Sequence, residues 1–129
     1  MNVPNAAHTG ALIGLLIFAL GLNTSLRRMK TGIYKGDGGD EPLRRASRAH
    51  GLAVEHGPLL VLLLLLLELQ GAPAQALLYV GIAIVVARAW AAISMLGLLR
   101  ALPGSIPAGL TYTLEFALPV WLLFNVIHH

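Results

Sequence analysis

The chain has 129 residues, of which 57% are hydrophobic and only 12% are charged, and its mean hydropathy is +0.74. Soluble domains are about one quarter charged, so this composition excludes a surface that faces water throughout and predicts a membrane-embedded domain. The chain has no cysteine, which excludes disulfides, thiolate metal ligands and a cysteine nucleophile, and its net charge of +3 lies mainly between apolar stretches, which argues against nucleic acid binding.

Four segments of the sequence are long and apolar enough to cross a bilayer, for which about 20 residues are needed. The second contains nine consecutive aliphatic residues, 59–67. The expected spans run over residues 7–26, 48–70, 76–99 and 108–127. They predict an all-α fold, an integral membrane four-helix bundle in which residues 1–129 form a single domain.

The connections between the spans differ in length and chemistry. The second and third, at 70–75 and 100–107, are short and contain glycine and proline, which break helices. The first, at 27–44, is longer, and its run of glycine and aspartate predicts a flexible polar loop with local turns. Asp40 is placed to cap the N-terminus of the helix that follows.

The basic residues predict how the chain is oriented, because lysine and arginine concentrate on the cytoplasmic side of a membrane. Arg100 lies in the third connection, and the N-terminal segment and the second connection have no lysine or arginine. Seven of the nine basic residues lie in or beside the first connection: Arg27, Arg28, Lys30, Lys35, Arg44, Arg45 and Arg48. We therefore expect loops 27–44 and 100–107 to be cytoplasmic and both termini to lie on the opposite side.

Three ionisable residues fall well inside the expected spans, where a charge costs about 2.5–3.5 kcal/mol and is by default a functional hypothesis: Glu55, Arg88 and Glu115. At about 1.5 Å of rise per residue, both glutamates lie about 10 Å from the basic side and Arg88 about 16 Å. An arginine side chain is long and snorkels, so its guanidinium can meet either carboxylate in one layer. These residues predict a polar site in the half of the bundle nearest the basic loops.

The second span carries a cationic rim that leads to a carboxylate. Arg45, Arg48 and Glu55 follow one stripe of the helix, with Leu52 between them. Such a stripe attracts acidic molecules to the arginines and an ammonium group to the glutamate. Two interpretations stay open at this point: a ligand site, or arginines that bind lipid phosphates beside a structural pair of Glu55 and Arg88.

Two further patterns indicate packing or no function. Gly10 and Gly14 form a small-xxx-small pattern, which lets helices approach closely. His50 and His56 are six residues apart, a poor spacing for one metal on a helix, so no metal site is expected.

The stretch from Arg48 to Pro58, Arg-Ala-His-Gly-Leu-Ala-Val-Glu-His-Gly-Pro, resembles the signature of the MAPEG family, the membrane-associated proteins in eicosanoid and glutathione metabolism. The family pattern is Arg-Ala-His-x-Asn-x-x-Glu-x-x-Pro. Arg45, the leucine run and Arg88 are also similar to features of bacterial members, and the likeness covers nearly the whole chain. The sequence therefore resembles a bacterial member of the microsomal glutathione S-transferase type.

This resemblance implies a homotrimer of four-helix protomers. In a bacterial inner membrane, the orientation that the basic residues predict places both termini in the periplasm. The resemblance also implies that glutathione binds as a co-substrate at the subunit interfaces near the cytoplasmic face, while lipid surrounds the assembly. Carried over by motif, the residues that bind glutathione are Arg48, His50, Glu55 and Arg88, with Arg45 in support; His56, where many members have another residue, is added to this set. The two carboxylates of the tripeptide suit arginine, and its ammonium group suits a glutamate.

The sequence departs from the family pattern at two points that matter for catalysis. Leu52 replaces asparagine, which removes a polar contact to the peptide. No lysine or arginine follows Arg100, although active members have an arginine near there that stabilises the thiolate. The catalytic candidates are therefore Arg88 and Arg100.

The expected function is a membrane-bound, glutathione-dependent transferase or peroxidase that acts on lipophilic electrophiles. The alternative is a non-catalytic membrane trimer that binds glutathione or lipid. A small proton-coupled exporter is a third hypothesis, against which the first span argues because it contains no carboxylate.

Overall fold

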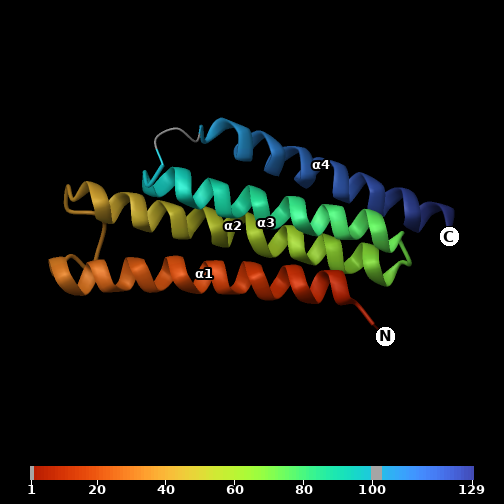
Figure 1. Ribbon diagram of the computed structural model, residues 1–129, viewed down its shortest axis with the longest axis horizontal. Helices are drawn as coiled ribbons and strands as arrows, with labels where there is room; N and C mark the ends of the chain where they lie inside the picture. The colour runs from red at the N-terminus through yellow and green to blue at the C-terminus, as the bar shows by residue number, and fades with distance from the viewer. Residues whose placement is uncertain (1, 100–102) are drawn as a thin grey trace.

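The computed structural model describes residues 2–99 and 103–129, and these residues form four helices in sequence (Figure 1). The helices are α1 (Pro4–Thr31), α2 (Glu41–Leu69), α3 (Ala74–Leu96) and α4 (Ser105–His128). Each is long and apolar enough to cross a membrane. The chain is an all-α membrane protein, and the expected fold class is confirmed.

The first two helices extend beyond the expected spans at their basic ends. α1 continues past the apolar stretch to Thr31 and ends at Gly32, whose φ of 72° is the left-handed conformation that terminates helices. α2 begins at Glu41, seven residues before the expected start at 48, because Leu43 and Ala46 continue its buried face. Most of the basic residues of the first connection therefore stand on helical turns, which fix the directions of their side chains.

The loop between α1 and α2 is held by polar bonds of its own. The guanidinium Nη1 of Arg28 donates to the carbonyl of Ile33 at 3.0 Å, and the amide of Gly39 donates to Oδ1 of Asp37 at 2.9 Å. Asp40 occupies the expected N-cap position, but within the described chain its carboxylate makes no capping bond. The aspartate-rich run thus forms the local turns that the sequence predicts.

α3 ends at Leu96, three residues before the expected end of its span, because Gly97 also adopts a left-handed conformation with φ of 72°. A Cβ atom at position 97 would lie only 2.9 Å from Nη1 of Arg45. Glycine therefore ends the helix and lets the guanidinium of Arg45 lie against it. A cation at this position complements the negative C-terminal end of the helix.

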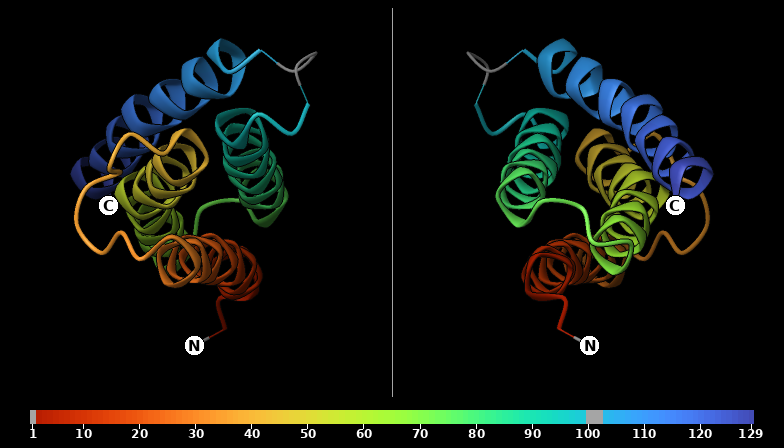
Figure 2. Two further views of the ribbon diagram at one scale, coloured as in Figure 1. Left: turned by 90° about the vertical axis from the view of Figure 1, so that its left-hand side faces the viewer. Right: turned by 90° about the vertical axis from the view of Figure 1, so that its right-hand side faces the viewer.

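The four helices form a bundle in which one member lies to the side. α1, α2 and α3 contact one another, whereas α4 contacts α2 and α3 and, within the described residues, does not reach α1. The end-on views show α4 on the far side of α2 and α3 from α1 (Figure 2). Both termini lie at one end of the bundle, and the α1–α2 loop lies at the other (Figure 1).

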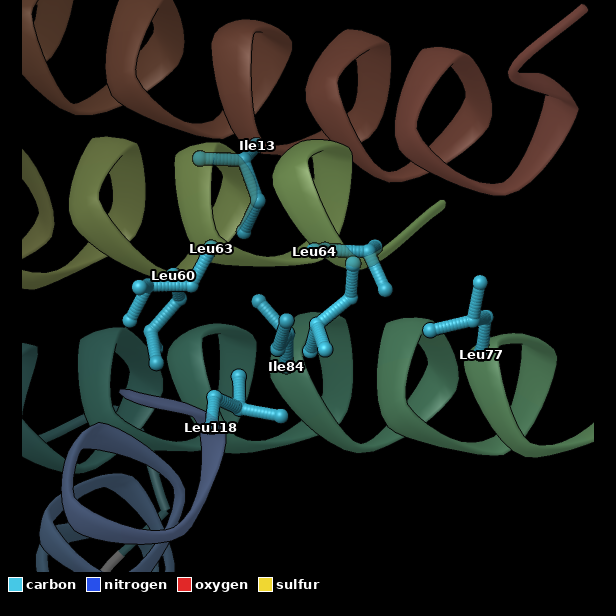
Figure 3. Close-up of a cluster of buried hydrophobic side chains, with 8 residues drawn as sticks. Ile13, Leu60, Leu63, Leu64, Leu77, Ile84 and Leu118 are labelled. Carbon is cyan, nitrogen blue, oxygen red and sulfur yellow. The ribbon is translucent and has the colours of Figure 1, made fainter. Parts of the chain in front are cut away.

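Large aliphatic residues fill the half of the bundle nearest the termini. Leu60, Leu64 and Leu77 are fully buried there, and Ile13 of α1, Ile84 of α3 and Leu118 of α4 join them (Figure 3). The other half has a smaller core of Leu20, Ala49, Ala53 and Ala92. Because alanine fills less volume than leucine, the half with the basic residues has room for a cavity.

Close contact between α1 and α2 depends on glycine. A Cβ at Gly57 would lie 2.8 Å from Cγ2 of Ile13, and one at Gly10 would lie 3.3 Å from Cγ1 of Val61. A Cβ at Gly14 would meet nothing within 4 Å. Only the first glycine of the small-xxx-small pattern therefore faces α2, and Gly57 marks the closest approach.

The carboxylate of Glu68 joins the start of α1 to the end of α2. Its Oε1 accepts the backbone N–H and the side-chain amide of Asn5, both at 3.0 Å, and its Oε2 accepts the N–H of Ala6 at 2.8 Å. The first N–H groups of a helix have no partner within the helix, so this glutamate caps α1 from a distance of more than 60 residues in sequence. Glu68 lies near the end of the expected span 48–70, and no sequence pattern indicated this role.

Candidate functional site

A cavity of about 510 Å³ lies between α2, α3 and α4, at the end of the bundle that carries the basic residues. Three small residues from α3 and the α4 region line it and leave its volume open: Ala91, Gly104 and Ala108. This volume falls within the range of about 300–1,000 Å³ that is typical of small-molecule sites. The cavity is therefore the candidate functional site.

The outer rim of the cavity is cationic and comes from the first two turns of α2. Arg44 and Arg45 both pair with Glu41, and Nε of Arg45 lies 3.1 Å from Oε1 of that carboxylate. Arg48 stands one turn further in, and its Nη1 lies 3.8 Å from Oε1 of Glu55. Three arginines beside a single acidic residue of the rim give it a positive charge that attracts an anion.

The inner wall of the cavity is polar although it lies among apolar helices. The side chain of Arg88 on α3 is only 4% exposed, and its Nη2 donates to the hydroxyl of Thr111 on α4. Among the residues that the structure describes, Nε of Arg88 has no hydrogen-bond partner. Glu115, one turn along α4 from Thr111, interacts with Arg88 electrostatically. A buried guanidinium with an unused donor is suited to hold an anion in the cavity.

A second polar pair crosses from α2 to α4 beside Arg88. Nδ1 of His56 lies 2.5 Å from Oε1 of Glu115, and the two side chains are only 16% and 17% exposed. The ring of Tyr112 meets the imidazole edge to face, with centroids 5.7 Å apart. His56 itself lines the cavity. The cavity therefore combines a cationic rim, a buried arginine and a histidine whose orientation a carboxylate fixes.

The structure brings four of the predicted site residues together: Arg45, Arg48, His56 and Arg88 all line the cavity. Arg88 contacts α4 rather than Glu55, so of the two carboxylates that the sequence offered as its partner, Glu115 is the one in reach.

Two of the predicted residues lie elsewhere on α2. His50 faces α1, since a Cβ at Gly21 would lie 3.0 Å from its Nε2. It stands two residues from Arg48, about 200° around the helix, and so points away from the cavity. The side chain of Glu55 is 57% exposed on the outside of the chain. Their contacts with glutathione stay predictions. Arg100 lies outside the described residues.

Several residues of the site were not indicated by any sequence pattern, among them Glu41, Thr111 and Tyr112. Glu115 was recognised as a charge inside a span, but its pairing with His56 was not. A threonine in an apolar helix gives no signal, since its hydroxyl usually bonds within its own helix. The pairing depends on how α4 crosses α2, which spacing along the chain does not reveal.

The fold and the site define a class: four-span membrane proteins with a basic, partly polar cavity between helices. The chain belongs to the MAPEG family, whose model matches residues 6–124, and the family resemblance is confirmed. The chain is 36% identical over 67 residues to the inner membrane protein YecN of Escherichia coli K12, and equally to YecN of Escherichia coli O6:H1.

Each of these matches covers 52% of this chain and 51% of the relative. The chain therefore spans about half the length of the curated relatives that it matches. No solved structure matches the chain.

Proposed function

We propose that this chain is a glutathione-dependent transferase or peroxidase that acts on lipophilic electrophiles at the cavity between α2, α3 and α4. The observation that carries the proposal is that the cationic rim and the buried Arg88 line the same cavity. Family membership supports glutathione as the co-substrate.

The charges of the cavity complement those of the tripeptide. Glutathione has two carboxylates, which suit Arg44, Arg45 and Arg48, and one ammonium group, which suits Glu41 or the outward-facing Glu55. Arg48 and His56 are eight residues apart on α2, or about 12 Å along the axis. An extended tripeptide spans about 10 Å. The tripeptide is therefore about as long as the cavity is deep, and its central cysteine side chain can turn toward the inner wall while carboxylates are held at the rim.

The inner wall supplies what the thiol needs. A free cysteine thiol has a pKa of about 8.5, and lowering it by two units takes about 2.7 kcal/mol of preferential stabilisation of the thiolate. Arg88 is buried and has an unused N–H, so it can supply a charge-assisted bond in a poorly hydrated site. We assign thiolate stabilisation to Arg88, with Arg100 as the second candidate.

The rest of the lining is suited to an apolar second substrate. Leu52, Ala91 and Met95 give the cavity apolar walls, and the site lies within helices that cross the bilayer. A lipophilic electrophile or lipid hydroperoxide partitions into the surrounding membrane and reaches such a cavity without crossing water. This accounts for a glutathione enzyme that is built inside a membrane.

The exposed charges on α2 support assembly into a homotrimer. Arg48 and Glu55 are 58% and 57% exposed on a helix that crosses the membrane. Facing lipid there would cost about 2.5–3.5 kcal/mol per charge, which a neighbouring protomer removes by covering them. A site at the subunit boundary would then bring Glu55 back to the glutathione. We place the first loop on the cytoplasmic side and both termini in the periplasm, since the basic residues follow that rule.

Binding of glutathione to the purified protein in detergent tests the proposal, by calorimetry together with the ultraviolet difference spectrum of the thiolate. Arg48→Ala should weaken binding by at least about tenfold, because a charged hydrogen bond contributes about 1.5–3 kcal/mol. Lys35→Ala, which removes an equal charge from the exposed loop, should leave the affinity unchanged. Equal affinities of the two variants would remove Arg48 from the site.

One observation favours the alternative of a non-catalytic glutathione- or lipid-binding trimer. Leu52 lines the cavity, so the position where the family has asparagine offers no polar contact to a peptide. Glutathione that binds without a thiolate signal and without turnover would establish this alternative.

A further inference from the structure

We propose that His56, held by Glu115, is the base that removes the proton from the glutathione thiol. The inference rests on the proposed glutathione function and adds a catalytic residue to it. It assigns a proton acceptor to a site in which charge alone would otherwise have to produce the thiolate.

The hydrogen bond to Glu115 determines which nitrogen of His56 is free. An ionised carboxylate only accepts hydrogen bonds, so Nδ1, at 2.5 Å from Oε1 of Glu115, carries the proton in that bond. Nε2 then carries the lone pair. The cavity is lined by His56, so the nitrogen with the lone pair belongs to the side chain that faces the ligand space.

The surroundings of His56 suit a proton transfer. Two residues of α4 face His56: the carboxylate of Glu115 and the ring of Tyr112. Arg88 of α3 is bonded to Thr111 of the same helix α4. Thr111 and Glu115 are one turn apart on α4, so the arginine and the histidine are attached to neighbouring turns of the same helix. A thiol between them would have a base on one side and a stabilising cation on the other.

The step is a simple proton transfer followed by attack. The S–H bond of glutathione breaks, the proton forms an N–H bond with Nε2 of His56, and the electron pair stays on sulfur. The thiolate, held by Arg88, then forms a bond to the electrophile. In an aromatic substitution, as with 1-chloro-2,4-dinitrobenzene, the C–Cl bond breaks, chloride leaves with its electron pair, and the imidazolium releases its proton to water. In a conjugate addition the imidazolium returns its proton to the carbon that becomes negative.

A hydroperoxide uses the same proton. The thiolate attacks the terminal peroxide oxygen, the O–O bond breaks, and the released alkoxide takes the proton from His56. The sulfenic acid of glutathione that remains is reduced by a second glutathione, which gives the disulfide and water.

This assignment accounts for the absence of lysine and arginine after Arg100. A second cation lowers the free energy of a thiolate by charge, whereas a base takes up the proton directly. A positioned general base contributes about 10²–10⁴-fold to a rate. The His56–Glu115 pair therefore supplies the activation that a late arginine would otherwise provide.

Substituting asparagine or glutamine for His56 tests the roles of the two ring nitrogens separately. The side-chain amide of asparagine can replace Nδ1 in the bond to Glu115, but nothing replaces Nε2. His56→Gln does the reverse, since its amide reaches toward the Nε2 position and leaves Glu115 without its partner. His8→Asn, at an exposed histidine of α1 near the opposite end of the bundle, is the matched control.

The experiment measures glutathione affinity by calorimetry, the thiolate absorbance of the complex, and turnover of 1-chloro-2,4-dinitrobenzene against pH. His56→Asn should bind glutathione with nearly unchanged affinity, lose the thiolate signal at neutral pH, and turn over at least about 100-fold more slowly. Its rate should recover as the pH rises toward about 8.5, because the bound thiol then ionises without the base while Arg88 still stabilises the anion. Glu115→Gln, which affects a positioning residue, should shift the pH profile of kcat with little change in KM.

The outcomes separate the two proposals. A thiolate signal and neutral-pH turnover that persist in both His56→Asn and His56→Gln would overturn the base, while glutathione catalysis would stand. Wild-type protein that binds no glutathione would overturn both. If His56→Asn loses helix content by circular dichroism, the decision falls to His56→Gln, which should show the same lost signal beside a normal His8→Asn.

Discussion

Replacing Glu68 by glutamine tests whether a residue near the end of α2 holds the start of α1. The wild-type carboxylate accepts three hydrogen bonds from Asn5 and Ala6, at 2.8–3.0 Å. The amide of glutamine keeps one acceptor oxygen, but its NH₂ group faces a backbone N–H that it cannot accept. At least one of the first N–H groups of α1 is then left without a partner.

The expected loss follows from three contributions. Removal of an N-cap acceptor costs about 0.5–2 kcal/mol, and loss of a negative charge at a helix N-terminus costs about 0.3–1 kcal/mol. The amide oxygen of Glu68→Gln still accepts one bond, which offsets part of this. We expect the free energy of unfolding to fall by about 2 kcal/mol. The change is local, so α2, α3 and α4 should keep their mutual packing.

Unfolding in mixed detergent micelles, followed by far-ultraviolet circular dichroism, measures the global effect. Hydrogen exchange at the amides of Asn5 and Ala6 measures the local one. Glu41→Gln is the control, because this carboxylate is exposed at the other end of α2 and its removal should leave the unfolding midpoint unchanged. If Glu68→Gln matches Glu41→Gln and both amides stay protected, the capping bonds do not stabilise the bundle.

Three further predictions concern packing, assembly and topology. Gly57→Val should destabilise by about 1–3 kcal/mol in the same unfolding assay, because its Cβ would lie 2.8 Å from Ile13, whereas Gly14→Val should have little effect. Native mass spectrometry in detergent should show three protomers, and a monomer at working concentrations would contradict the homotrimer. Because the chain has no cysteine, the single cysteines of Lys35→Cys and Asn2→Cys can be labelled selectively with a membrane-impermeant maleimide. Lys35→Cys should react from the cytoplasm and Asn2→Cys from the periplasm. Labelling of both variants from the same side would contradict the orientation.

The helices could be predicted from the sequence because apolar length is a strong local signal. The expected spans each overlap one helix, and the N-cap position of Asp40 was also correct. The helix ends were less predictable. α2 begins seven residues early because its first turns bury Leu43 and Ala46 against other helices, which the charged residues between them conceal. α3 ends early at Gly97, because composition alone does not distinguish a glycine that ends a helix from a glycine inside one.

The site was predictable only where its residues lie on one face of a single helix. Arg45 and Arg48 share one face of α2, and helical periodicity places them together without knowledge of the fold. The pairs that cross between helices, such as His56 with Glu115, depend on the crossing position of α4, which no local pattern encodes. His50 belongs to the motif but faces α1, so membership of a motif does not place a side chain in the cavity.

The attachment of α4 links the chemistry of this protein to its assembly. α4 lacks contact with α1 within the described residues, and two of its polar bonds to the bundle join Thr111 to Arg88 and Glu115 to His56. The side chains assigned to the reaction therefore also help to hold the last helix, together with the apolar contacts of Leu118. A substitution that removes one of these side chains is therefore expected to change how firmly α4 is held as well as the charge of the cavity.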